Sequence, residues 1–190
     1  MPRFTRIALA LVVVGVLAGC SLKPPASFPR EHHVNLHKYM GPWYVIAHIA
    51  PSKTQNAYNE IERYTLTKPN TVKTVFTYRK GGFNGKLKTL RPTATVIPNT
   101  GNAVWGMEFF WPIKLQYVIS YVSPNYKTTI VARSKHDYVW IMARKPHISK
   151  AKYQSLVHRV AKLGYNTNKL KRVPQQPLSK RNDLKAPPKQ

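Results

Sequence analysis

Two glutamates, Glu60 and Glu62, are the side chains of this chain best suited to acid–base chemistry. They lie in a run of β-forming residues, "YNEIERYTLT", where strand alternation places both on one face. A carboxylate on a buried face is costly unless it is paired. The sequence leaves open whether both contact an inward lysine, lie at a wet opening, or turn outward through a β-bulge. If the chain is an enzyme, Glu62 is its candidate acid–base residue.

No other pattern in the sequence indicates catalysis. The chain contains no Gly-x-Ser-x-Gly turn and no Gly-rich phosphate loop. His32, His33 and His37 offer imidazole groups to a metal, but they fall in a segment with the composition of a tether. We therefore expect neither an enzyme nor a bound metal or other cofactor. Asp137 is predicted to cap a turn.

The position of Cys20 indicates lipidation, and because it is the one thiol of the chain, it excludes an internal disulfide. Residues 7–18 form a charge-free, mostly apolar run behind Arg3 and Arg6. This run is shorter than the about 20 residues that span a bilayer, and it has the layout of a secretory signal. It ends in "LAGC", which resembles the bacterial lipobox, where the chain is cut before the Cys and that Cys is acylated.

We predict a lipoprotein signal peptide over residues 1–19 and attachment to a membrane through acyl chains on Cys20. Several acyl chains, at roughly 0.8 kcal/mol per buried CH₂, hold a protein on a membrane almost permanently. Ser21 follows the Cys in place of an Asp, which by the sorting rule of such lipoproteins indicates the outer membrane. The alternative is an ordinary signal peptide followed by a chance Cys.

The chain is strongly basic, with 31 Lys and Arg against 6 Asp and Glu. Such a balance commonly indicates a nucleic-acid partner, but the export signal argues against nucleic acid here. Anionic lipid head groups are the partners that an exported basic surface meets, at about 1 kcal/mol per charge. A general basic drift of the surface is the alternative, so the charge alone identifies no ligand.

Both ends of the chain that follows the signal are predicted to lack regular structure. Residues 20–34 are predicted to be a lipidated tether, which Pro24, Pro25 and Pro29 keep extended. Residues 174–190 combine prolines with lysines and arginines, and we predict a basic, Pro-rich disordered tail there. The segment between them, residues 35–173, is long enough for one domain with one core.

Short runs rich in Val, Ile, Thr, Tyr and Phe follow one another in this segment, separated by turn residues at hairpin spacing. They cover residues 43–50, 58–67, 71–80, 87–97, 103–110, 115–122, 127–133 and 138–144. Short loops favour antiparallel pairing of neighbouring strands. A meander of this length can close into a barrel that holds one small ligand.

A helix is predicted after the last strand. Apolar residues recur at helical spacing between Ser149, which can cap the N-terminus, and Gly164, which can end the helix. The stripe consists of Tyr153, Leu156, Val157, Val160 and Leu163. Because such a stripe needs a partner, the sequence predicts an all-β fold with one C-terminal α-helix packed outside the sheet.

The order of these elements and three motifs resemble the lipocalin family. "NLHKYMGPWYVIA", residues 35–47, is similar to the opening segment of bacterial lipocalins. "EFFWP", residues 108–112, resembles their fifth strand and its turn, and "DYVWIMARKP", residues 137–146, resembles their last strand. With the lipobox, the resemblance points to outer-membrane lipocalins of the Blc type, relatives of apolipoprotein D. It covers about residues 34–176 and implies an eight-stranded antiparallel up-and-down β-barrel.

The same resemblance implies a structural motif at one end of that barrel. An Arg at the end of the last strand packs over the face of a Trp, and these residues are Arg144 and Trp43 here. Gly41 lets the backbone approach closely, and Pro42 fixes the chain as it enters the strand. A desolvated cation–π pair of this kind contributes roughly 2 kcal/mol. We therefore expect Trp43 to plug the barrel rather than to contact a ligand.

Alternation along the strands predicts which side chains face the barrel interior. Tyr64 also matches a pocket tyrosine of the family. The predicted ligand-binding set is Tyr64, Trp105, Met107, Phe109, Tyr117, Ile119, Tyr138, Trp140 and Met142. An aromatic cavity lined in this way suits an acyl chain. The alternative is that the same side chains only fill a solid core.

The chain is therefore predicted to hold a fatty acid or lysophospholipid, for lipid storage or transport in envelope maintenance at the outer membrane. The alternative function is a non-transporting module whose basic surface binds lipopolysaccharide or another envelope protein. The sequence also leaves a homodimer open.

Overall fold

The computed structural model describes residues 22–50 and 54–181. Its helices are α1 (Leu36–Tyr39) and α2 (Lys150–Lys162). Its strands are β1 (Gly41–Ile49), β2 (Ala57–Lys68), β3 (Thr71–Lys80), β4 (Leu87–Leu90), β5 (Thr93–Val96), β6 (Val104–Phe110), β7 (Ile113–Val122), β8 (Thr128–Ala132), β9 (Val139–Ala143) and β10 (Lys171–Arg172). Within the described ranges, no helix is long and apolar enough to cross a bilayer.

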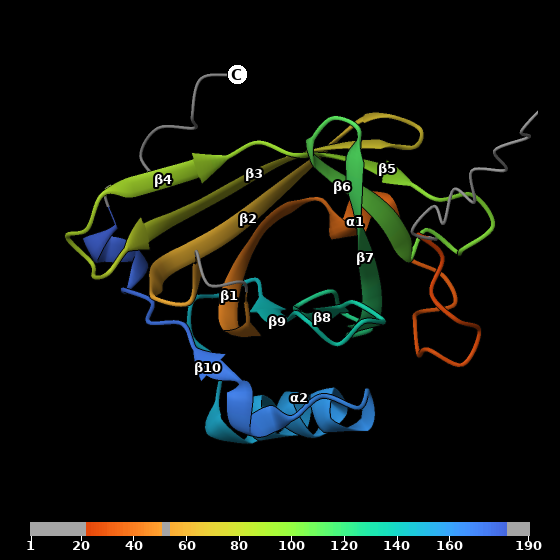
Figure 1. The fold of residues 1–190 in the computed structure, drawn as a ribbon. Helices are drawn as coiled ribbons and strands as arrows, with labels where there is room; N and C mark the ends of the chain where they lie inside the picture. Colours follow the sequence, from red (N-terminus) through yellow and green to blue (C-terminus); the bar gives the residue numbers. More distant parts are fainter. Residues whose placement is uncertain (1–21, 51–53, 182–190) are drawn as a thin grey trace, which may run out of the picture.

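The strands form a closed antiparallel barrel, as the sequence predicts (Figure 1). Neighbours pair in the order β1-β2-β3-β5-β6-β7-β8-β9, and β9 pairs back with β1. The strand predicted over residues 87–97 is divided into β4 and β5 by Arg91 and Pro92, because proline has no N–H for the ladder. The two-residue β10, which pairs with β1, was not indicated by the sequence pattern.

Alternation along the strands divides the apolar side chains between two clusters. The inner cluster lies within the barrel and includes Trp43, Tyr64 and Trp105. The outer cluster joins the other face of the strands, with residues such as Ile141, to Leu156 of helix α2. Helix α2 therefore packs outside the barrel, below the ring of strands in Figure 1, as predicted.

The ends of α2 follow the capping residues that the sequence indicates. The Ser149 hydroxyl accepts a hydrogen bond from the backbone N–H of Lys152 at 3.2 Å, which satisfies one of the free donors of the first turn. Gly164 follows the helix with a φ of +87°, a conformation that favours glycine. The helix is thus fixed locally at both ends before its apolar stripe packs on the barrel.

The segment predicted as a tether differs from the expected extended chain over residues 22–34. Phe28 is buried in the outer cluster, and Val34 is buried in the inner one. The Glu31 carboxylate accepts a hydrogen bond from the backbone N–H of Val122 at 2.8 Å. These two apolar side chains favour packing on the barrel over extension into solvent. The predicted signal peptide and Cys20 lie outside the described residues.

The segment predicted as a disordered tail also differs, over residues 174–181. The side-chain amide of Gln175 donates hydrogen bonds to the backbone carbonyls of Val45 at 2.8 Å and Glu60 at 2.9 Å. The guanidinium of Arg181 donates to the backbone carbonyl of Asn59 and to Gln175 Oε1, each at 2.9 Å. The pairing of β1 with β2 ends at Tyr44 and Ile61, so the carbonyls beyond this point, on Val45 of β1 and on Asn59 and Glu60 of β2, accept from these donors instead. Residues 182–190 lie outside the described part of the chain.

Candidate ligand-binding site

One end of the barrel is closed by Trp43. Its indole N–H donates a hydrogen bond to the backbone carbonyl of Tyr39 at 2.8 Å. The Arg144 guanidinium carbon lies 3.8 Å from the centroid of the Trp43 ring. The same guanidinium donates to the backbone carbonyls of Pro42 and Lys38, each at 2.8 Å, and of Tyr39 at 3.0 Å. Trp43 and Arg144 are therefore brought together in the arrangement that the family resemblance implies.

Gly41 adopts a backbone conformation at this end of the barrel that other residues rarely adopt. Its φ of +92° lies in the left-handed region, where a side chain is strained. A Cβ at this position would also lie 3.5 Å from Arg144 Nη1, in contact with the group that covers Trp43. Any other residue therefore strains the turn on which the plug depends.

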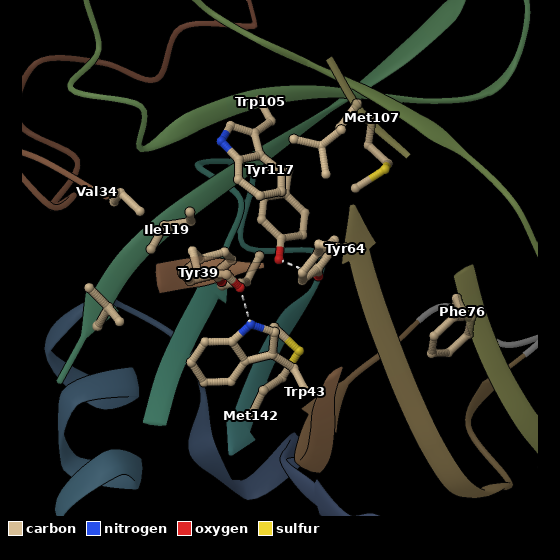
Figure 2. Packing of buried hydrophobic residues seen from close by; sticks show 14 of the residues in the cluster. Val34, Tyr39, Trp43, Tyr64, Phe76, Trp105, Met107, Tyr117, Ile119 and Met142 are labelled. Carbon is tan, nitrogen blue, oxygen red and sulfur yellow. Dashed lines mark hydrogen bonds between the residues drawn. The ribbon is translucent and has the colours of Figure 1, made fainter. Parts of the chain in front are cut away.

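Aromatic rings fill the barrel above the plug (Figure 2). The rings of Trp105 and Tyr117 are stacked, with centroids 5.1 Å apart and planes 10° apart. Tyr64 meets Trp105 edge to face at 5.5 Å, and Tyr39 lies 5.8 Å from Tyr64. The Tyr64 and Tyr117 hydroxyl oxygens are 2.5 Å apart, and the Tyr39 hydroxyl lies 3.3 Å from Thr129 Oγ1. The polar ends of these buried rings thus find partners inside the barrel.

Most of the predicted ligand-binding set lies in the barrel interior. Members of the inner cluster are Tyr64, Trp105, Met107, Tyr117, Ile119 and Met142. Trp140 packs against this cluster, and the buried Tyr138 lies beside it with ring centroids 4.6 Å apart. The side chains come from β2, β6, β7 and β9, together with Tyr138 next to β9, so that barrel closure rather than sequence proximity assembles the set.

Phe109 differs from its predicted interior position. The pairing of β6 with β7 shifts register between Glu108 and Phe110, and such a bulge ends the simple alternation of faces. The Phe109 side chain is 39% exposed and joins the surface of the β6–β7 hairpin. The apolar tip of this hairpin is exposed further, with Phe110 at 79%, Trp111 at 85% and Ile113 at 64%.

Glu60 and Glu62 both lie in the barrel interior, which decides between the alternatives that the sequence left open. Glu62 is paired across β1 and β2 with Trp43, which is an inner residue. Glu60 Oε2 lies 3.0 Å from His48 Nδ1, and these two side chains are 0% and 2% exposed. The register of β2 does shift, between Tyr58 and Ile61, but it leaves both carboxyls inside. Their partners are His48 and the Tyr64 hydroxyl, which donates to Glu62 Oε2, in place of an inward lysine.

The buried setting favours the neutral form of these carboxyls. Burial, reinforced by the nearby Glu60, raises the pKa of Glu62 to about 8. Burial also raises the pKa of Glu60, although the hydrogen bond and charge of His48 oppose this effect. Burial likewise raises the pKa of the Tyr117 hydroxyl well above its usual value. Near neutral pH the interior therefore holds a protonated Glu62 beside neutral tyrosine hydroxyls.

A cleft of about 590 Å³ lies outside the barrel, between the segment around α1 and the β2–β3 turn. Its lining includes His33, His37, Leu66 and Lys68. Across the described ranges, His, Cys, Asp and Glu side chains form no group of three or more that could hold a metal ion. The structure thus brings His33 and His37 to a surface cleft without the ligand set that a metal site needs.

Sequence reasoning missed the pairing of His48 with Glu60. Plain alternation from Trp43 places His48 on the outer face of β1. A register shift between Val45 and Ala47 reverses this parity, so that His48 pairs with the inner Trp140. The complementary chemistry of His48 and Glu60 was the one available signal in the sequence. It gave no indication that a bulge would bring the two side chains together.

A closed antiparallel barrel that is plugged at one end, lined by aromatic side chains and flanked by one helix defines the class of small-ligand-binding β-barrels. The chain belongs to the lipocalin family, because the model of the family described as "Lipocalin-like domain" matches residues 34–175. Membership in this family supports binding of a small hydrophobic ligand, and lipocalins are generally binding proteins rather than enzymes.

The chain is similar to lipocalins from several sources. It is 28% identical over 152 residues to temperature-induced lipocalin-1 of Arabidopsis thaliana, covering 75% of this chain and 80% of that protein. It is 22% identical over 170 residues to outer membrane lipoprotein Blc of Vibrio cholerae, covering 89% of this chain and 99% of that protein. Among solved structures, insecticyanin of the tobacco hornworm Manduca sexta has the same fold. Its TM-score is 0.61 at 12% identity, with 80% of this chain and 85% of that chain covered.

Proposed function

We propose that this chain is a lipid-binding lipoprotein of the outer membrane, anchored there through acyl chains on Cys20. Its barrel holds a fatty acid or a lysophospholipid, and the protein stores or transports this lipid in envelope maintenance. Binding is reversible burial of apolar surface, at about 25 cal/mol per Å² before the entropic costs of association. The protein acts as a carrier and not as an enzyme.

The observation that carries this proposal is the aromatic lining of the barrel interior. Trp105, Tyr117 and Met142 come from separate strands and all belong to the inner cluster. Trp105 and Tyr117 lie above the Trp43 plug, and Met142 lies beside it (Figure 2). Large apolar side chains with a few placed hydroxyls are the usual lining of a site for a small amphiphilic ligand. The partly exposed Trp140 lies beside Tyr138 at the edge of this set.

The exposed β6–β7 hairpin supports a source for the ligand. Phe110, Trp111 and Ile113 form an apolar tip, and Lys114 follows directly. An apolar tip with a neighbouring cation suits the boundary between acyl chains and anionic head groups. A lipid that leaves a bilayer beside this hairpin passes directly from one apolar surface to another.

The outer-membrane location rests on two supports. The sequence around Cys20 resembles a lipobox, and Ser21 follows it. Relatives from Vibrio cholerae, Citrobacter freundii and Escherichia coli carry the name outer membrane lipoprotein Blc. The plant relative is named for temperature induction and not for an outer membrane. The proposed location therefore rests on the similarity to the bacterial relatives.

A second candidate function is favoured by the tight packing of the interior. Trp43, Trp105 and Ile119 are fully buried, and the 590 Å³ cleft with Lys68, His33 and His37 lies outside the barrel. A barrel that stays filled would act as an envelope module, whose basic surface binds lipopolysaccharide or another protein. The two functions differ in whether the interior opens for a ligand.

Native mass spectrometry of residues 22–190 distinguishes the carrier from the filled envelope module. This piece contains the helices and strands that the structure describes, including all strands of the closed barrel. A lipid that co-purifies with the protein, and is lost in Trp140→Ala while the circular dichroism spectrum is kept, supports the carrier. A mass that stays empty after addition of fatty acids and lysophospholipids refutes the carrier and favours the filled module.

A further inference from the structure

The barrel interior carries a polar face on its β1–β2 side. His48 comes from β1, and Glu60 and Glu62 come from β2. His48 is paired with Trp140, and Glu62 is paired with Trp43, so that each polar residue lies beside an indole that faces the interior. Acidic and aromatic groups are thus mixed along one wall of an otherwise apolar barrel.

One oxygen of this face has no partner. Glu60 is fully buried and bonds His48 through Oε2, while Oε1 has no hydrogen-bond partner among the described residues. A buried polar atom without a partner destabilises the fold, so folded proteins seldom keep one without a purpose. A donor supplied from outside the chain would satisfy this oxygen.

The remaining hydrogen bonds of the face also leave acceptors toward the interior. The Tyr64 hydroxyl donates to Glu62 Oε2, so that in the Tyr64–Tyr117 bond the Tyr117 hydroxyl is the donor. This chain of hydroxyls ends on the Glu62 carboxyl. Glu60 and Glu62 together offer carboxyl oxygens that a ligand with several N–H donors can meet.

The chemistry of the ligand's polar end follows from these groups. An anionic head group beside Glu60 and Glu62 would meet like charge or force both carboxyls to stay protonated. A protonated amine instead supplies three donors and a positive charge to the carboxyls. The indole of Trp140, which is only partly buried, adds a face that attracts a cation.

We infer that this polar face receives the protonated amino group of an amphiphilic ligand, whose apolar chain lies among the interior aromatic side chains. The inference rests on the proposed function, because it requires that the barrel binds an apolar ligand at all. Among the proposed ligands, it favours a lysophospholipid with an amino head group over a free fatty acid.

Binding of an amine by this face carries a proton signature. The cation stabilises the ionised form of Glu62, whose proton passes to the buffer. Other titratable groups around Glu62 are Glu60 and Tyr64 on β2, His48 on β1, Tyr39 on α1, Tyr117 on β7 and Tyr138 next to β9. Because burial holds the pKa of Glu62 near 8, amine affinity should rise with pH up to about 8 and then level off.

Calorimetric titration of residues 22–190 with dodecylamine, dodecanol and laurate tests the inference at one chain length. We expect dodecylamine to bind at least about tenfold more tightly than laurate at pH 7.5. In buffers of different ionisation enthalpy, the amine should release protons and the alcohol should release none. Glu62→Gln should weaken binding of the amine by about tenfold and binding of the alcohol by clearly less. Glu108→Gln, which removes a carboxylate paired with Lys114, is the matched control.

The outcomes separate the head-group inference from the proposed function. Equal binding of all three probes, tighter binding of laurate, or an amine affinity that is unchanged in Glu62→Gln would overturn the inference and leave the apolar carrier in place. If none of the three probes binds, both the head-group inference and the proposed carrier function are overturned. The proton-release measurement uses the unaltered chain, so the test does not depend on the folding of a variant.

Discussion

The closed end of the barrel and the polar face on β1 and β2 both bury polar groups but satisfy them differently. At the closed end, the Arg144 guanidinium reaches four backbone carbonyls and the Trp43 ring. On the polar face, one oxygen of Glu60 has no partner among the residues that the structure describes, and Glu62 lies near a second acid. A fully satisfied network stabilises the fold, whereas a partly satisfied one lowers stability unless a ligand completes it.

This difference assigns separate tasks to the two regions. The charge of Arg144 is spread over acceptors that the chain itself provides, so the closed end needs nothing from outside. Glu60 and Glu62 are buried among the apolar side chains of the inner cluster, and burial of their carboxyls lowers the stability of the fold. Stability is thus concentrated at the closed end, and capacity for binding at the polar face.

The largest expected effect comes from removing the plug. Trp43→Ala should lower the free energy of unfolding by about 3–5 kcal/mol, because it leaves a large cavity and removes the partner of Arg144. Urea unfolding measures this change. Trp111→Ala removes the same side chain from a position that is 85% exposed and should change stability by less than about 0.5 kcal/mol. Equal losses for the two variants would refute the assignment of stability to the closed end.

The polar face should make the free energy of unfolding depend on pH. The pKa of Glu62 is raised to about 8 in the folded chain, so folding favours its protonated form. Its contribution is present at low pH and is lost as pH rises toward 8, amounting to roughly 4 kcal/mol across this interval.

Glu62→Gln isolates this term, since it keeps the shape of the side chain and removes the titration. The difference in the free energy of unfolding between the wild type and Glu62→Gln should fall steadily between about pH 4.5 and pH 8. Urea unfolding at several pH values measures it. A difference that is constant across this range would show that Glu62 is not held neutral by burial.

The cation at the closed end should matter more than a similar cation outside the barrel. Arg144→Lys should cost about 2 kcal/mol, because an ammonium cannot cover Trp43 and also reach the carbonyls that the guanidinium reaches. Arg159 provides the control, since its guanidinium lies 4.1 Å from the Tyr121 ring on the outer surface. Arg159→Lys should cost less than about 1 kcal/mol at an exposed site. Thermal and urea unfolding of both variants decide the comparison.

The smallest expected effect concerns one hydroxyl of the closed end. Tyr39→Phe removes the contact with Thr129 Oγ1 and keeps the ring that packs on Trp43. The expected cost is about 1 kcal/mol, the net value of a typical buried hydrogen bond. Thr129 retains a bond to the Tyr121 carbonyl, so it is not left unsatisfied. A loss as large as that of Trp43→Ala would mean that the hydroxyl network, and not the indole, holds this end.

The closed end was largely predictable from the sequence, and the polar face was not. Gly41, Pro42 and Trp43 are adjacent in the chain, and the family resemblance supplied Arg144 as the partner. The polar face depends on where β1 and β2 leave regular pairing, and the sequence allowed an inward or an outward direction for Glu60 and Glu62. A bulge is set by the partner strand as well as by its own residues, so one strand cannot reveal it.

The sequence by itself determined the periodicities of this protein. Alternating β-branched and aromatic residues, turn residues at hairpin spacing and one amphipathic stripe ending at Gly164 specify a meander of strands and a helix, because these signals are local. The tertiary structure alone decided which side chains meet. Register shifts turned His48 inward and Phe109 outward, and the separation of β1 from β2 gave Gln175 its place between them. Such contacts join residues far apart in the chain, and their free energy appears only after the barrel has closed.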